Sequence, residues 1–237
     1  MSAASALTWT ARLLAWSLFL QAVEWWQARS LLRASFPWHI VRRDYGVRFE
    51  DRAWPGLVLA QAVLAIALAL SDAALWPWSA LVLALLHAAR FRGNYNGGSD
   101  AMTLVVLLGL AIGRTFSAPA GLGYITAQLV LSYFLAGCWK LRDRAWRDGS
   151  ALERLLALPQ YRSTPLVVPG TRWLGYGVLA FECAFPLALF GLALPFAALG
   201  ITFHAVNARV LGLNRFLWAW LAAYPALFYW SGLLSPR

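Results

Sequence analysis

The most prominent pattern along the chain is a series of continuous apolar runs separated by short polar stretches rich in arginine. Continuous runs favour helices over the alternating strands of a closed barrel. A helix needs roughly 20 mostly apolar residues to cross the hydrocarbon core of a bilayer. The pattern therefore predicts eight membrane helices, at residues 7–26, 56–71, 74–89, 102–116, 121–139, 173–190, 194–208 and 214–233.

Composition supports a membrane protein. Hydrophobic residues make up 61% of the chain and charged residues 13%, whereas a soluble domain has roughly 45–50% apolar and 25% charged residues. One globular core cannot hide so much apolar surface. We therefore expect an all-α, polytopic integral membrane helical bundle, with residues 1–237 forming a single domain.

The charges predict an orientation for this bundle. The chain has 20 basic and 10 acidic residues, which gives a net charge of +10. The basic residues gather in the loops that follow the first, third, fifth and seventh predicted helices. Only Arg12, Arg114 and Arg237 lie elsewhere. Because basic loops stay in the cytoplasm, both termini are expected outside, in a bacterial inner membrane. The arginines would face anionic lipid headgroups, and no nucleic acid partner is expected.

Residues 141–160 predict a short interfacial helix on the basic side. Ser150 followed by Glu153 forms a capping-box pattern, and Leu152, Leu155 and Leu156 lie on one side of the resulting turn. A plain amphipathic connector would show the same pattern.

Polar residues inside apolar spans are the candidates for chemistry, because ionisable groups are costly there. Lys140 is the only lysine in the chain, and it ends the fifth predicted helix. A lysine can lose its proton in an apolar pocket, whereas an arginine stays charged, although Lys140 can also be a snorkelling anchor. Other candidates are Glu182, the pair His204 and Asn207 on one helical face, and Gln128 with Tyr133.

The loop 91–102 is a further candidate. It places Asn94, Asn96 and Asp100 before an apolar helix. Either Ser99 or Asp100 caps that helix, or its N-terminus binds an anion or a carbonyl group. No metal site is expected, because Cys138 and Cys183 lack CxxC spacing and the three histidines lack HxxxH spacing.

Three segments carry a resemblance to a known family. "AQLVLSYFLAGCWKLRDRAWRDG", "LAFECAFPLALF" and "TFHAVNARVLGLNRFLWAWLAAYPALF" resemble, in this order, membrane helices of the vitamin K-dependent γ-glutamyl carboxylases. "YNGGSDAM" resembles, more loosely, their asparagine-rich turn. Together the segments cover roughly residues 85–230. The bacterial relatives are known as HTTM-domain proteins, and this chain resembles a minimal one.

The resemblance implies a chemistry. In the carboxylases the lysine that matches Lys140 is the base that deprotonates vitamin K hydroquinone. The oxygenated quinone then removes a γ-proton from glutamate, and CO₂ traps the carbanion. Glu182 matches an acidic residue of the intervening helix, while His204 and Asn207 would line the cavity. The resemblance thus implies a quinone or hydroquinone cofactor.

The sequence also departs from that family. Gly98 stands where the carboxylases have a histidine, and their large soluble domain has no counterpart before Arg237, so carboxylation of a protein substrate is not expected. The family's eukaryotic chemistry faces the lumen, whereas the charge pattern puts Lys140 on the cytoplasmic side.

Three functions remain open at this stage. The first is an enzyme, either a carboxylase-like lyase or ligase or a quinone-linked oxidoreductase, acting on a lipid-soluble small molecule. The second is a DoxX-like redox subunit that uses Cys138 and Cys183. The third is a non-catalytic scaffold or transport subunit, in which polar residues only join helices. Expected partners are membrane lipids and other membrane or redox subunits.

Overall fold

The computed structural model describes residues 1–29, 53–91, 97–158 and 170–234, and within these ranges the chain is all-helical, without a strand. Seven of the eight predicted apolar segments each overlap one α-helix, whereas the segment 173–190 is divided between an α-helix and a 3₁₀-helix. The elements are α1 (Ala3–Gln27), α3 (Trp54–Leu70), α4 (Leu75–Phe91), α5 (Gly98–Thr115), α6 (Ala118–Arg142), α7 (Arg144–Arg147), α8 (Ala151–Leu156), α9 (Thr171–Ala184), the 3₁₀-helix η3 (Phe185–Leu189), α10 (Ala193–Leu211) and α11 (Asn214–Leu234).

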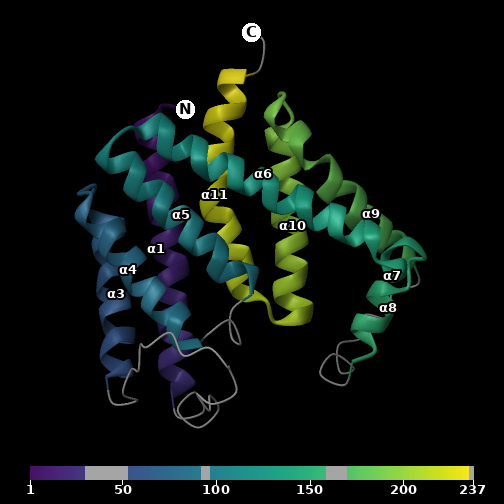
Figure 1. Ribbon diagram of the computed structural model, residues 1–237, viewed down its shortest axis with the longest axis horizontal. Coiled ribbons are helices and arrows are strands. Elements are labelled where there is room, and N and C mark those ends of the chain that lie inside the picture. The colour runs from purple at the N-terminus through teal and green to yellow at the C-terminus, as the bar shows by residue number, and fades with distance from the viewer. Residues whose placement is uncertain (30–52, 92–96, 159–169, 235–237) are drawn as a thin grey trace.

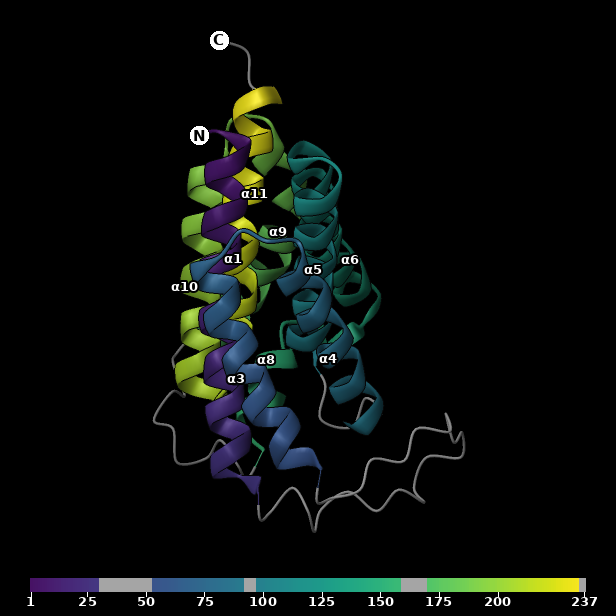
Figure 2. The ribbon, with the colours of Figure 1, turned by 90° about the vertical axis from the view of Figure 1, so that its left-hand side faces the viewer.

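The long helices run alternately up and down, so that the start of α1 and the end of α11 lie at the same end of the bundle (Figure 1). Helix α1 packs against both α3 and α11, and α6 contacts α5, α9 and α11. In the view turned by 90°, α1 and α11 lie on one side of the bundle and α5 and α6 on the other (Figure 2). The short helices α7 and α8 follow the basic end of α6.

Three helices in the described ranges are long and apolar enough to cross a membrane: α5, α6 and α10. Helix α3 and residues Leu75–Ala89 of α4 are apolar but shorter. Large hydrophobic side chains also point outward along these helices, among them Val63, Leu70 and Leu194. The structure thus has the outward-facing apolar surface that a lipid environment requires.

Glycines allow a close contact between the backbones of α5 and α6. A Cβ atom on Gly121 would overlap the carbonyl oxygen of Gly109 and would lie 2.6 Å from the Cα of Gly113. Small residues of this kind let two backbones touch, which is a common way for membrane helices to associate. The contact holds the start of α6 against the end of α5.

Two details of helix capping differ from the sequence-based expectation. Helix α5 begins at Gly98, so Ser99 and Asp100 lie inside its first turn, and Gly97 occupies the cap position. Asp100 there still complements the positive end of the helix dipole.

The expected capping box at α8 does not form. Ser150 is the N-cap residue but makes no capping hydrogen bond with its side chain. Its hydroxyl and backbone N–H instead donate to Asp148 at 2.6 and 2.9 Å, and these hydrogen bonds lower the pKa of that carboxyl. Glu153 accepts a 3.2 Å hydrogen bond from Thr171 and thereby ties α8 to α9.

Candidate functional site

One face of α6 carries the residues on which the candidate site is built. Tyr133, Gly137 and Lys140 are four and three positions apart, a spacing that places them on the same side of a helix. This side faces α9, which packs along α6. The face therefore brings Lys140 close to Glu182 in the last turn of α9, and Tyr133 close to His204 in α10.

Lys140 forms an ion pair with Glu182. Its Nζ atom donates to Oε1 at 2.6 Å and to Oε2 at 2.5 Å. The Glu182 side chain is 4% exposed and the Lys140 side chain 22% exposed, so the pair lies at the inner edge of the bundle rather than in open solvent. The Trp146 ring covers the amine from the α7 side, with its centroid 5.1 Å from Nζ.

Gly137 makes this ion pair possible. A Cβ atom at Gly137 would lie 2.7 Å from Sγ and 2.9 Å from the backbone N of Cys183, and 3.1 Å from Cβ of Glu182. Any larger residue would push α9 away from α6 at the height of the pair. The glycine thus sets the distance that lets Lys140 reach Glu182.

A chain of hydrogen bonds lies deeper in the bundle on the same face of α6. The Tyr133 hydroxyl is 2.8 Å from Nε2 of His204 and 2.8 Å from the hydroxyl of Tyr224. All three side chains are buried. The Phe185 ring stacks on Tyr133 at 4.0 Å between centroids, and Trp220 lies 5.0 Å from the imidazole.

Two buried nitrogen atoms of this cluster have no hydrogen-bond partner in the described part of the chain. They are Nδ1 of His204 and Nε1 of Trp220. An unsatisfied buried donor costs about 1–3 kcal/mol, so such atoms are uncommon in a folded protein. A polar acceptor atom brought close to either nitrogen would supply the missing hydrogen bond.

Gly200 provides the space for the two tyrosine hydroxyls. A Cβ atom at this position would overlap the Tyr224 hydroxyl and would lie 3.1 Å from that of Tyr133.

We expect Gly200→Ala to lower the free energy of unfolding by about 1–3 kcal/mol. Adding Tyr224→Phe removes the clashing oxygen and should recover part of that loss. SDS-induced unfolding in mixed micelles measures both. Gly232→Ala is the control, because nothing lies within 4 Å of a Cβ there. Equal losses of the free energy of unfolding in Gly200→Ala and Gly232→Ala would contradict the close contact between Gly200 and the tyrosine hydroxyls.

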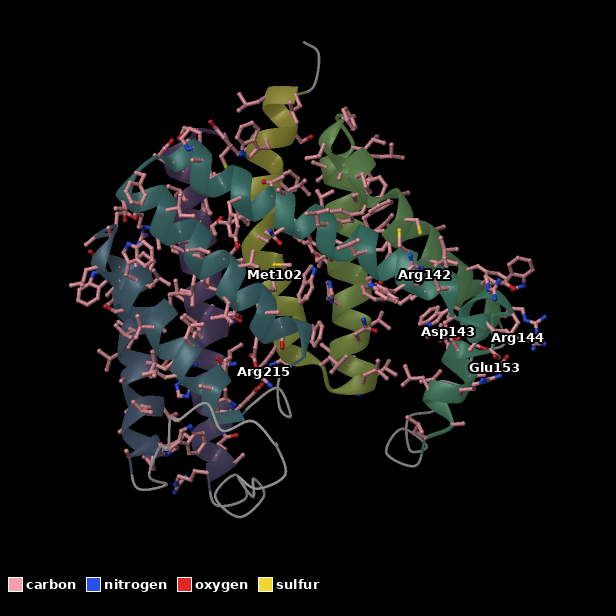
Figure 3. All side chains as sticks on the ribbon, in the orientation of Figure 1. Met102, Arg142, Asp143, Arg144, Glu153 and Arg215 are labelled. Atoms are coloured by element: carbon pink, nitrogen blue, oxygen red, sulfur yellow. The ribbon has the colours of Figure 1, made fainter. Side chains whose placement is uncertain are left out.

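A second polar network lies where α1, α5 and α11 meet. Asp100 accepts from Gln21 at 2.8 Å and from Arg215 at 3.1 Å. Glu24 lies 3.7 Å from Arg215 and accepts from Asn214 at 3.1 Å. A cavity of about 300 Å³ adjoins this network and is lined by Glu24, Gly97, Ser99, Gly212, Leu213, Asn214, Arg215 and Phe216. In Figure 3, Arg215 lies left of the centre, whereas Arg142 and Asp143, at the end of α6, lie on the right, so this network is separate from the end of α6.

The structure divides the predicted site residues between these places. Lys140 pairs with Glu182, and Tyr133 contacts His204, whereas Asp100 belongs to the separate network around Arg215. Asn207 is half-buried one turn after His204. Its backbone carbonyl oxygen accepts a hydrogen bond from the backbone N–H of Leu213.

The remaining predicted residues contribute less. Gln128 is half-buried on α6, five positions before Tyr133, and so lies on a different side of that helix. Asn94 and Asn96 lie outside the described residues.

Sequence reasoning missed Tyr224, Gly137 and Gly200. Tyr224 is uncharged and stands in an apolar run directly before Pro225, so only its hydroxyl could have suggested a role.

In the described residues no group of three or more histidine, cysteine or acidic side chains could hold a metal ion. Comparisons with protein-family models, with curated proteins and with solved structures found no match to this chain.

Proposed function

We propose that this chain is an integral membrane enzyme in which the Lys140–Glu182 pair is the base for a lipid-soluble substrate of the hydroquinone class. The observation that carries the proposal is the ion pair itself. The only lysine of the chain is held by a buried carboxylate at the point where two apolar helices touch.

The pair offers a route for a proton. In a medium of low polarity the ammonium can pass its proton to the Glu182 carboxylate, because charge separation is costly there. The neutral amine of Lys140 can then take the proton of an acidic hydroxyl. An arginine could not do so, since its guanidinium stays protonated.

The deeper cluster fits the same class of ligand. His204 and Trp220 each carry a buried nitrogen atom that has no partner among the described residues, and their rings lie 5.0 Å apart. Imidazole and indole N–H groups can donate to the oxygen atoms of a planar ring. A hydroquinone would supply the acidic hydroxyl; Tyr133 and Tyr224 would hold the imidazole in place.

We further propose that the family is the carboxylase-like HTTM family and that eight helices span a bacterial inner membrane. The alternating helices and the shared end of the two termini support an even number of spans (Figure 1). The charge pattern supports cytoplasmic basic loops, which puts Lys140 near the cytoplasmic side.

The test compares the purified protein with its Lys140→Arg variant, which keeps the positive charge for Glu182. A short-chain naphthohydroquinone is the probe, and its oxidation is followed by absorbance together with oxygen uptake. We expect the variant to fold and to bind the probe but to turn it over at least about 100-fold more slowly. Arg142→Lys is the matched control at an exposed position nearby. Full turnover by Lys140→Arg would overturn the proposal.

A further inference from the structure

Two cysteines lie on the facing helices α6 and α9, beside the ion pair. Cys183 directly follows Glu182, and Cys138 stands two residues before Lys140. The Cys183 sulfur points at α6, since a Cβ atom on Gly137 would lie 2.7 Å from it. Cys138 is the next residue along α6 after this contact. Both cysteines are reduced and only partly buried.

The environment links the two thiols to each other and to the ion pair. Cys183 interacts electrostatically with Cys138, with Glu182 and with Lys140. A thiol needs a base to become the reactive thiolate. Lys140 is a cation that favours a thiolate at Cys183, whereas the charge of Glu182 opposes it. Each thiol therefore has the other as a partner, and the ion pair lies beside them.

The chain contains two cysteines in total, so a disulfide within one molecule can join only these two. The backbone N of Cys183 would lie 2.9 Å from a Cβ atom on Gly137, so α9 approaches α6 closely one residue before Cys138. Such a close approach of two backbones is what a disulfide between facing helices needs. A bond here would join α6 to α9 within two residues of each member of the ion pair.

We propose that Cys138 and Cys183 form a redox-active dithiol that a membrane quinone oxidises to an intramolecular disulfide. Both S–H bonds break and one S–S bond forms. The two electrons and two protons pass to the quinone, which becomes the hydroquinone. The site thus converts quinone to the hydroquinone class that the Lys140–Glu182 pair is proposed to deprotonate. The inference shares that ligand class with the proposed function but requires no turnover by Lys140.

The test uses the purified full-length protein, reduced and then freed of reductant. One sample receives tetramethylbenzoquinone, whose ring is fully substituted, and another receives diamide, a general thiol oxidant. Free thiols are counted by maleimide labelling and mass spectrometry, and the hydroquinone formed is measured by absorbance. Cys138→Ser and Cys183→Ser are the matched controls, each with one thiol.

With both oxidants we expect the free thiols of the monomer to fall from two to none. The quinone sample should yield one hydroquinone per disulfide, and each serine variant should keep its remaining thiol. If diamide but not the quinone formed the intramolecular disulfide, the proposal that a quinone is the oxidant would be wrong. If both thiols stayed free with both oxidants, or if disulfides formed only between molecules, the proposed redox-active dithiol would be wrong. Because no outcome depends on hydroquinone turnover, loss of activity in Lys140→Arg leaves this test intact.

Discussion

The variant Gly121→Ala is expected to lose about 3 kcal/mol or more of its free energy of unfolding. A Cβ atom there would meet only backbone, namely the carbonyl oxygen of Gly109 and the N and Cα atoms of Gly113, both at 2.6 Å. Backbone cannot turn aside as a side chain does, so α5 and α6 must move apart along their shared length. SDS-induced unfolding in mixed micelles measures the loss.

Gly177→Ala is the matched control for that loss. Gly177 lies in α9, and nothing is found within 4 Å of a Cβ at this position. Because alanine favours a helix over glycine, this variant should be neutral or more stable by up to about 1 kcal/mol. If Gly121→Ala behaved like Gly177→Ala, the contact between α5 and α6 would not be as close as described.

The variant Lys140→Met is expected to lose about 3 kcal/mol of its free energy of unfolding at neutral pH. Methionine keeps the length of the side chain but leaves the Glu182 carboxylate buried, at 4% exposure, without its cation. Removing one partner of a buried pair costs about 3–5 kcal/mol, because the remaining charge stays desolvated. The expected loss lies at the low end of this range because the Lys140 side chain is 22% exposed, so the pair is only partly removed from solvent.

A double-mutant cycle separates the pair from the packing around it. Glu182→Leu removes the buried charge, so Lys140→Met combined with Glu182→Leu should cost far less than the sum of the two single variants. Both single variants and the double variant are unfolded under the same conditions. Additive losses would show that Lys140 and Glu182 contribute independently, and the coupled base of the proposed function would then lose its support.

The helical character of the apolar segments could be predicted because each is a continuous apolar run rather than an alternating one. The prediction of eight membrane spans is matched only in part, since three helices in the described ranges are long and apolar enough to cross a membrane. The ends were less certain. At α5 the apolar pattern starts at Met102, yet the helix begins at Gly98, because Asp100 is held inside the first turn by Gln21 and Arg215. Those two partners are 79 and 115 residues away in the chain, so no local pattern could reveal them.

The site shows the same limit. Lys140, Glu182 and His204 could be singled out because charged or titratable residues are rare in apolar helices. Their pairing could not, since it depends on how α9 and α10 lie against α6. The importance of Gly137 and Gly200 follows only from the atoms that surround them, because a glycine in an apolar run has no distinctive local signal.

The packing of α1 against α11 has a consequence for biogenesis. Glu24 on α1 accepts a hydrogen bond from Asn214, 190 positions later in the chain, and lies 3.7 Å from Arg215 at the start of α11. This contact between α1 and α11 can therefore form only after almost all of the intervening chain has been synthesised.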